Sequence, residues 1–396
     1  MRIENLTASP LSAVSDFVAA ITGPHYAADI LPYVVMPYPG QALNPFHELL
    51  YGAADIAKTV VVPLSDLRTV EQIHWGDRLA IHLHWLHVLF KSARSDKDAD
   101  AIVLDFGERI GRWKERGIRV IWTVHNILPH QQRFPDAELA LHRMVAEHAD
   151  LIHVMNHQTA ELTRPWYELP RSRIACIPHP SYAGWYGNTI RKSHARRMLG
   201  IADDEIVFLC FGSIQPYKGL LELVRAFERL RTQYPEKRMR LLIAGGVASA
   251  EYAKSVKQLA LAGSGISVIA RRIPEGHVQV YFNAADVAVA PYTRTLNSGV
   301  ALLAATFRRP LVAPAMGAMA EVLGAGHPLL YDPKAEDGLD AAMGRSLGYV
   351  AEPGYFDEIL ERHEPGKIST AFFAEVQKMF EGKAPVRKGR LQGRKK

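Results

Sequence analysis

Cysteine is scarce in this sequence, since the 396 residues contain only Cys176 and Cys210. Both lie in apolar runs of the kind that forms strands. Two cysteines can supply neither a disulfide framework nor a four-ligand zinc site. This usage is typical of a protein from a reducing compartment, and we expect a cytoplasmic location.

A long hydrophobic run is also missing. No stretch of about 18 uncharged apolar residues free of proline and glycine occurs, so we expect no segment that spans a bilayer. The apolar residues near the start are interrupted by Asp16, which does not fit a secretion signal.

A net positive charge is lacking over most of the chain, although the whole sequence sums to +6. The last fourteen residues, 383–396, hold seven Lys or Arg and no acid, so the rest of the chain sums to −1. We interpret this segment as a solvated, disordered basic tail. Because the positive excess lies in this tail, residues 1–382 give no reason to expect nucleic acid as a partner. If the tail has a function, we expect it to be attraction to an anionic membrane surface at the inner face of the cell membrane.

The apolar content is sufficient for two cores. The sequence is 48% hydrophobic and 22% charged, and a single core stops growing at roughly 250 to 300 residues. Continuous apolar runs separated by helical segments predict parallel strands covered on both faces. The predicted strands are residues 32–37, 79–84, 101–105, 118–124, 151–155 and 173–177, then 206–211, 239–244, 266–270, 286–290 and 310–313.

The two series of strands begin and end alike, which predicts an α/β protein with two Rossmann-like, doubly wound parallel-sheet domains facing a cleft. In particular, Ala149-Asp150 and Ala285-Asp286 precede similar apolar runs. The expected limits are an N-terminal acceptor-side domain at 1–180, a linker at 181–200, a C-terminal domain at 201–350, C-terminal helices packing back at 351–382, and the tail at 383–396.

Ligands of such sheets bind beyond the carboxyl ends of the strands. In the second domain, Gly212 and Lys218 lie in the loop 211–219, FGSIQPYKG, between a strand and a helix. The glycine allows a close approach of the backbone, and the lysine can bind a phosphate. The alternative is an ordinary turn with a surface lysine.

A second loop of the same domain, residues 292–299, opens a helix at Ser298 and Gly299. The serine is a good N-cap, and the free amides of Ser298, Gly299 and Val300 would attract an anion. A cap alone would also explain the serine. Together with Lys218, a diphosphate site is the better interpretation.

In the first domain, His125 follows the strand 118–124, where it can bind a hydroxyl or act as a base. An equally acceptable explanation is a histidine bonded to a loop carbonyl. The loop at Gly40 and the helix start at Asn44 are predicted to form the opposing wall of the cleft. His84, at the end of another strand, is the second candidate base.

A metal site is not expected. Asp96, Asp98 and Asp100 form acidic pairs, but they are predicted to precede a strand within a charged run. His82 and His84 fall on one face of a strand, and no Cys or carboxylate stands close in sequence to complete a zinc site.

These motifs resemble those of GT-B glycosyltransferases, with a second half similar to the glycosyltransferase 4 type domain. The resemblance runs from about residue 32 to about residue 331 and is carried by residues 44–51, 123–126, 211–219, 285–287 and 298–313. It implies transfer of a sugar from a nucleotide diphosphate sugar without metal or other cofactor. The implied donor site is Gly212, Lys218, Gly219, Arg271, Arg272, Ile273, Asn297, Ser298, Gly299 and Val300, with His125, His84, Gly40, Asn44 and Asn126 on the acceptor side.

One departure from the family pattern affects donor recognition. The two glutamates that the family places eight positions apart fall at Thr295 and Leu303, and its usual arginine falls at Ser213. The pattern is closer to bacterial exopolysaccharide enzymes such as mannosyltransferases that use GDP-mannose, and the stereochemical outcome stays open. We therefore expect a glycosyltransferase that uses GDP-mannose or a UDP-sugar and a lipid-linked or polysaccharide acceptor. The alternatives are a non-catalytic relative that binds a nucleotide-sugar as a partner subunit and, from the tail alone, a nucleic-acid binder.

Overall fold

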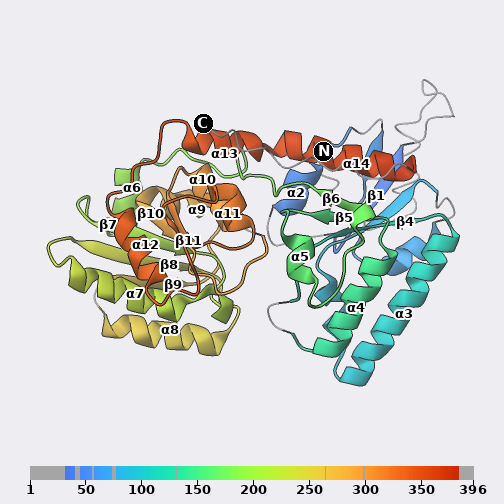
Figure 1. The fold of residues 1–396 in the computed structure, drawn as a ribbon, viewed down its shortest axis with the longest axis horizontal. Helices are drawn as coiled ribbons and strands as arrows, with labels where there is room; N and C mark the ends of the chain where they lie inside the picture. Colours follow the sequence, from blue (N-terminus) through green and yellow to red (C-terminus); the bar gives the residue numbers. More distant parts are fainter. Residues whose placement is uncertain are drawn as a thin grey trace. The chain divides into compact units, whose positions relative to one another are not determined.

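The computed structural model describes residues 32–40, 45–55, 58–73, 77–129, 132–263, 265–297 and 299–382. The chain divides into two compact units (Figure 1). The first unit is Met1–Pro178 together with Pro365–Lys396, and the second unit is His179–Glu364.

The first unit is built on a six-stranded parallel sheet of order β2-β1-β3-β4-β5-β6. Its central strands are apolar and buried on both faces, as parallel strands between helices must be. The strands are β1 (Tyr33–Tyr38), β2 (Thr59–Val61), β3 (Leu79–Leu83), β4 (Arg119–Thr123), β5 (Leu151–Val154) and β6 (Ile174–Cys176).

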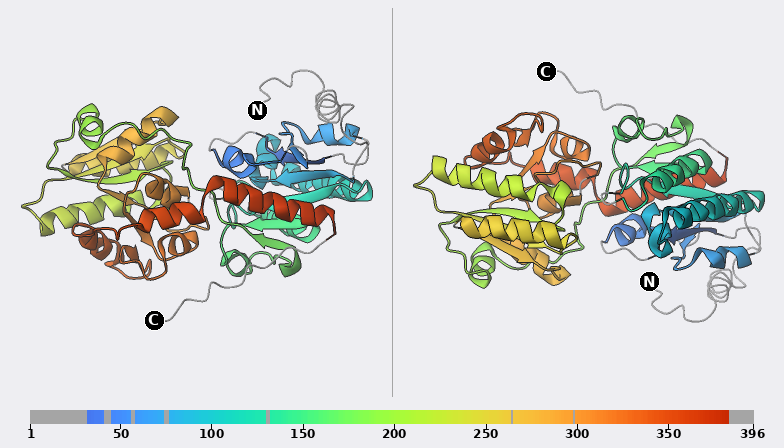
Figure 2. Two further views of the ribbon diagram at one scale, coloured as in Figure 1. Left: turned by 90° about the horizontal axis from the view of Figure 1, so that it is seen from above. Right: turned by 90° about the horizontal axis from the view of Figure 1, so that it is seen from below.

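The helices of the first unit include one from the far end of the sequence. Helix α14 (Pro365–Phe380) packs against α2 and β5, and Figure 2 shows it lying along this unit. Its Phe372 is fully buried. The other helices are α2 (Phe46–Tyr51), α3 (Asp96–Glu115), α4 (Pro135–His148) and α5 (Thr159–Thr163), with 3-10 turns η1 (Leu67–Gln72), η2 (Leu86–Ser92) and η3 (Arg171–Arg173).

The predicted strand at residues 101–105 is wrong, because this segment lies inside α3. The Ser95 side chain accepts the Asp98 N–H, and the Asp98 carboxylate accepts the Ser95 N–H, so a capping box starts the helix. The apolar residues of 101–105 belong to an amphipathic pattern, whose buried members, Ala99, Phe106, Ile110 and Trp113, follow a helical period.

The second unit carries another six-stranded parallel sheet, of order β12-β11-β10-β7-β8-β9. The predicted α/β class with two parallel-sheet, Rossmann-like units is confirmed. The strands are β7 (Ile206–Phe211), β8 (Met239–Gly245), β9 (Ile266–Ala270), β10 (Val287–Val289), β11 (Leu311–Pro314) and β12 (Leu330–Tyr331). The prediction missed β2 and β12, which have only three and two residues.

Helices surround this second sheet (Figure 1). They are α6 (Lys192–Met198), α7 (Leu220–Gln233), α8 (Ala250–Ala262), α9 (Glu275–Ala284), α10 (Gly299–Thr306), α11 (Ala318–Leu323), α12 (Gly338–Ser346) and α13 (Tyr355–Arg362), with a 3-10 turn η4 (Pro216–Lys218). Helix α7 buries an apolar face against the sheet, and its Phe227 ring lies 6.0 Å from that of Phe208 on β7.

The boundaries of the units differ from the predicted ones. The predicted linker at 181–200 contains α6, which packs against α9 within the second unit. Arg196 of α6 is 2% exposed, and its guanidinium donates to the Asp286 carboxylate at 2.7 Å. The predicted C-terminal helices divide between units, since α13 lies in the second and α14 in the first. Within the described residues, no helix has the length and apolar character to cross a membrane.

Strand order places the expected binding edge of each sheet. In the second unit the chain proceeds from β7 to β8 and β9, then returns to β10 on the other side of β7. In the first unit the corresponding reversal lies between β1 and β3. Ligands of open α/β sheets bind at such switch points, where adjacent loops diverge.

Candidate functional site

The loop after β7 adopts a conformation that requires glycine at two positions. Gly212 has φ 123° and Gly219 has φ 63°, both in the region that favours glycine. A Cβ on Gly219 would also collide with the Pro291 carbonyl oxygen, which belongs to the loop after β10. The two glycines therefore bring the loops after β7 and β10 into contact at the switch point.

Lys218 lies at this contact. Its side chain is only 8% exposed, and its ammonium donates to the Tyr292 hydroxyl and lies 3.8 Å from the centroid of the Tyr292 ring. The centroid of the Tyr217 ring lies 5.2 Å from Nζ. Sequence analysis missed Tyr292 as a site residue, although it stands six residues before the predicted N-cap.

The environment of Lys218 favours an anionic ligand. Burial lowers the pKa of the ammonium to about 8, with a small opposing effect from Cys210. Among the described residues, no carboxylate pairs with Nζ. A buried cation held only by aromatic rings and a hydroxyl is stabilised when an anion binds beside it.

The loop after β10 connects this lysine to the start of α10. The Thr293 N–H donates to the Tyr217 carbonyl at 2.9 Å, and the Thr295 hydroxyl donates to the Asn297 carbonyl at 2.9 Å. Gly299 opens α10, and a Cβ there would lie 2.7 Å from the Tyr182 hydroxyl. Asn297, Gly299 and Val300 are half-buried, and the predicted N-cap Ser298 lies outside the described residues.

Arg271, Arg272 and Ile273 follow β9 on the same edge of the sheet. Both arginines are exposed and Ile273 is half-buried. Because β8 separates β9 from β7, this segment is farther from the switch point between β7 and β10 than Lys218 is. The place of these three residues in the donor site, which the resemblance implies, remains a prediction.

The departure from the family pattern is visible on α10. Leu303 is 7% exposed and lies among buried neighbours, Ala301, Leu302, Ala304 and Ala305. A carboxylate at this position would be buried, which is costly without a partner. This helix therefore contributes its N-terminus to the edge, and Leu303 contributes packing.

In the first unit, the structure brings the two candidate histidines together. His84 Nδ1 lies 2.9 Å from His125 Nε2. The His125 ring stacks on Trp85, with centroids 4.2 Å apart, and meets the edge of Phe46 at 4.8 Å. His84 is buried, whereas His125 is half-buried, so His125 is the more accessible of the pair.

The histidines behind His125 are held neutral. Burial lowers the pKa of His82 and of His84 well below the ordinary value. It also lowers the pKa of His47 to about 4. Neutral imidazoles can accept protons and leave the site without net charge.

The remaining predicted residues of the first unit are Gly40, Asn44 and Asn126. Gly40 donates its N–H to the Leu64 carbonyl at 2.7 Å, and Asn126 is half-buried. Asn44 lies outside the described residues. Sequence analysis missed Tyr51, whose hydroxyl bonds both His82 and His84. The alternation that places His82 and His84 on one strand face is the signal in the sequence for a hydrogen-bonding partner beside them.

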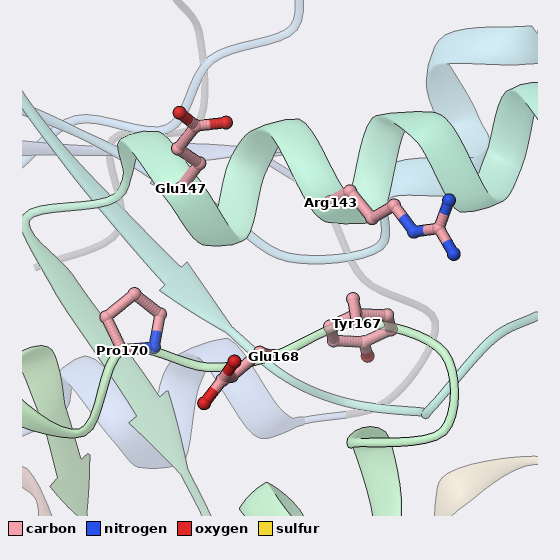
Figure 3. Close-up of a pocket in the computed structure, with 5 residues that line it drawn as sticks. All are labelled: Arg143, Glu147, Tyr167, Glu168 and Pro170. Carbon is pink, nitrogen blue, oxygen red and sulfur yellow. The ribbon is translucent and has the colours of Figure 1, made fainter.

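A separate pocket of about 390 Å³ lies beside α4, lined by Arg143, Glu147, Tyr167, Glu168 and Pro170 (Figure 3). Its only cation donates Nε to the Trp166 carbonyl, and two carboxylates share the lining. Such a charge balance opposes a diphosphate. Across the described ranges, no group of three His, Cys, Asp or Glu side chains has an arrangement suited to a metal ion.

Comparisons with known proteins agree with this geometry. Residues 205–348 match the family described as Glycosyl transferases group 1. GDP-mannose:glycolipid 4-beta-D-mannosyltransferase of Xanthomonas campestris pv. campestris is 26% identical over 276 residues, which are 66% of this chain and 70% of the relative.

Solved structures show the same fold. Sucrose-phosphate synthase from Thermosynechococcus elongatus has a TM-score of 0.67 at 17% identity, covering 89% of this chain and 100% of that one. Anabaena HepE in complex with UDP and glucose has a TM-score of 0.63 at 14% identity, covering 87% and 99%. The chain therefore has the GT-B fold, and its second unit carries a domain similar to glycosyl transferases of group 1. Among such enzymes it resembles mannosyltransferases, which confirms the resemblance drawn from the motifs.

Proposed function

We propose that this glycosyltransferase moves a hexose from GDP-mannose or a UDP-sugar to a lipid-linked or polysaccharide acceptor. The observation that carries the proposal is the buried ammonium of Lys218 at the switch point of the second sheet. In this proposal the diphosphate of the donor binds Lys218 and the amides at the start of α10. The 26% identity to a GDP-mannose:glycolipid mannosyltransferase supports the choice of donor and acceptor.

The proposed reaction needs no metal. As the glycosidic bond to the diphosphate breaks, its electron pair leaves with the phosphate oxygen, and Lys218 and the helix amides stabilise the added charge. Removal of divalent ions with EDTA should therefore leave transfer unchanged. Loss of transfer that Mg²⁺ or Mn²⁺ restores would contradict this part of the proposal.

We assign the acceptor side to the first unit. The acceptor hydroxyl forms the new bond to the anomeric carbon, and its proton passes to a base, for which His125 is the first candidate and His84 the second. The half-burial of His125 supports this order, because the substrate must reach the base.

The first experiment is a screen of nucleotide-sugars for protection against thermal unfolding, because a true donor adds stability with the logarithm of its occupancy. The selected donor is then tested for transfer to a panel of lipid-linked saccharides. Transfer supports the enzyme. Donor binding without transfer to any acceptor, together with no donor hydrolysis, would favour a non-catalytic partner subunit, the alternative that Thr295 and Leu303 raise.

The proposal includes contact with an anionic membrane surface, and the charge of residues 383–396 supports it. Deleting these residues should lower binding to anionic vesicles and leave donor affinity intact. High salt should act like the deletion, because the Debye length falls to about 3 Å at 1 M salt. Vesicle sedimentation that responds to neither change would exclude the tail as an anchor.

A further inference from the structure

A continuous chain of hydrogen bonds crosses the interior of the first unit from the segment after β6 to β3. His153 Nε2 lies 2.9 Å from the Ile177 carbonyl oxygen, and His153 Nδ1 lies 3.0 Å from Thr123 Oγ1. Thr123 Oγ1 in turn lies 2.7 Å from His82 Nε2. Three neighbouring strands, β5, β4 and β3, therefore each contribute one member on the same face of the sheet.

The chain of hydrogen bonds continues from His82 on β3 to His125. The Tyr51 hydroxyl of α2 lies 2.6 Å from His82 Nδ1 and 2.8 Å from His84 Nε2. His84 Nδ1 lies 2.9 Å from His125 Nε2, and this is the outermost of these hydrogen bonds. His125 is thus connected through five side chains to a backbone carbonyl on the far side of the unit.

The carbonyl at the inner end fixes the direction of the first bonds. A carbonyl oxygen only accepts, so His153 carries its hydrogen on Nε2. In a neutral imidazole the other nitrogen then accepts, and the Thr123 hydroxyl must donate to His153 Nδ1. With its hydrogen used, the threonine oxygen accepts from His82 Nε2–H.

The same logic determines the outer bonds. His82 Nδ1 has no hydrogen, so Tyr51 donates to it, and the Tyr51 oxygen accepts from His84 Nε2–H. His84 Nδ1 consequently accepts from His125 Nε2–H. Each side chain donates one hydrogen bond toward the Ile177 carbonyl, and no bond of the chain has a hydrogen on both of its atoms or on neither.

The packing around the chain keeps its members neutral. Phe372 of α14 stacks on His82 with centroids 5.1 Å apart and lies 5.5 Å from His153. His82, His153 and Thr123 are fully buried, and burial lowers the pKa of His153 to about 4. A polar chain inside a core is costly to bury unless each group is satisfied, as here, and apolar side chains would stabilise the fold more simply.

We propose that this chain is a relay that fixes the tautomer of His125, with hydrogen on Nε2 and the proton-accepting lone pair on Nδ1. His84, Tyr51, His82, Thr123 and His153 act as positioning residues. The tautomer stands on the hydrogen bonds alone. The identification of Nδ1 as the atom that takes the proton of the acceptor hydroxyl rests on the proposed function.

The test uses the full chain labelled with ¹⁵N-histidine, because two-bond proton–nitrogen correlations distinguish the tautomers. In the wild type at neutral pH, His82, His84, His125 and His153 should all show the neutral Nε2–H form, with signals assigned by single His→Gln variants. An Nδ1–H form or a cation at any of the four would overturn the relay. This measurement is made on the wild type and requires no activity, so it is independent of the proposed function; a His→Gln variant serves only to assign a signal.

Thr123→Val tests transmission along the chain. The variant nearly preserves the shape but removes the oxygen that accepts His82 Nε2–H, so this buried N–H would have no acceptor. Moving the hydrogen to His82 Nδ1 removes the unpaired donor. The bonds of Tyr51, His84 and His125 then reverse their direction. We expect Nδ1–H signals at His84 and His125, which an unchanged His125 spectrum in folded protein would contradict. Thr123→Ser should restore the wild-type spectrum. Thr163→Val, which removes another buried hydroxyl outside the chain, is the matched control and should change nothing.

Once transfer is measured, Thr123→Val should lower kcat by about tenfold or more and leave the KM for the donor unchanged, because the base presents the wrong nitrogen. Thr123→Ser should recover kcat. A tautomer change without a kcat change would preserve the relay and remove His125 from the base role, so the two ideas can fail separately.

Discussion

The two units have the same aspartate before one strand of the sheet, but they differ in the residues beyond the carboxyl ends of the strands. Asp150, before β5, accepts the Val120 N–H at 2.8 Å, and Asp286, before β10, accepts the Val207 N–H at 2.8 Å. Beyond the carboxyl ends, the second unit presents a buried cation, whereas the first presents neutral histidines. One sheet architecture thus presents a cation in one unit and neutral hydrogen-bonding groups in the other, as the proposed anion binding and proton transfer require.

His125→Ala tests the first unit's side of this comparison and should have the largest effect. General base catalysis contributes about 10²- to 10⁴-fold, so transfer should fall by that factor while calorimetric affinity for GDP or UDP stays the same. His157→Ala, outside this cluster, is the control. Equal transfer rates for wild type and His125→Ala would return His125 to a loop-bonding role.

The two aspartates should differ in what they contribute to stability. Asp286→Asn leaves the 2%-exposed Arg196 without its carboxylate, and breaking a buried ion pair costs about 3 to 5 kcal/mol. Asp150 pairs with Lys114, whose side chain is 31% exposed, so Asp150→Asn should cost about 1 kcal/mol. Urea unfolding of both variants measures the difference, and equal costs would show that the two devices are equivalent.

Lys218→Ala tests the second unit and should weaken binding of the nucleotide diphosphate by about 10- to 100-fold, because a charge-assisted hydrogen bond contributes roughly 1.5 to 3 kcal/mol. The fold should persist, since the side chain makes no carboxylate pair among the described residues. Calorimetry with GDP and UDP measures the change. Lys237→Ala, a surface change in the same unit, should leave affinity as it is.

The affinity for the diphosphate should depend on pH through Lys218 of the second unit. The pKa of Lys218 is lowered to about 8, so the ammonium is present below that pH and is lost above it. Diphosphate affinity should fall by about tenfold per pH unit above pH 8 in the wild type. In Lys218→Ala, the fall between pH 7 and 9 should be absent. A wild-type profile that is flat over this range would contradict a titrating lysine at the diphosphate.

Most of the fold could be predicted from the sequence because buried parallel strands are continuous apolar runs, as at residues 206–211 and 239–244. The prediction failed at 101–105, where a short apolar run is compatible with either a strand or a helix and only the capping box at Ser95 distinguishes them. The shortest strands, β2 and β12, give too little pattern to detect.

The candidate site could be predicted only in part. Gly212, Lys218 and His125 were found because they stand at strand ends, where parallel sheets place their ligands. Tyr292 and Tyr51 were missed, since an aromatic residue in a loop or short helix has no periodicity that marks it. The linker was misplaced because the pairing of Arg196 with Asp286 joins residues 90 positions apart.

The sequence by itself determined the two parallel sheets, their loops and the residue types available at each edge, because these follow from local hydrophobic patterns and glycine positions. Only the tertiary structure decided the protonation of the histidines. That property depends on strand order, which aligns His82, Thr123 and His153 across three strands, and on α14, which brings Phe372 from the far end of the chain to cover them. Hydrogen bonds and burial of this kind join residues that no local pattern connects.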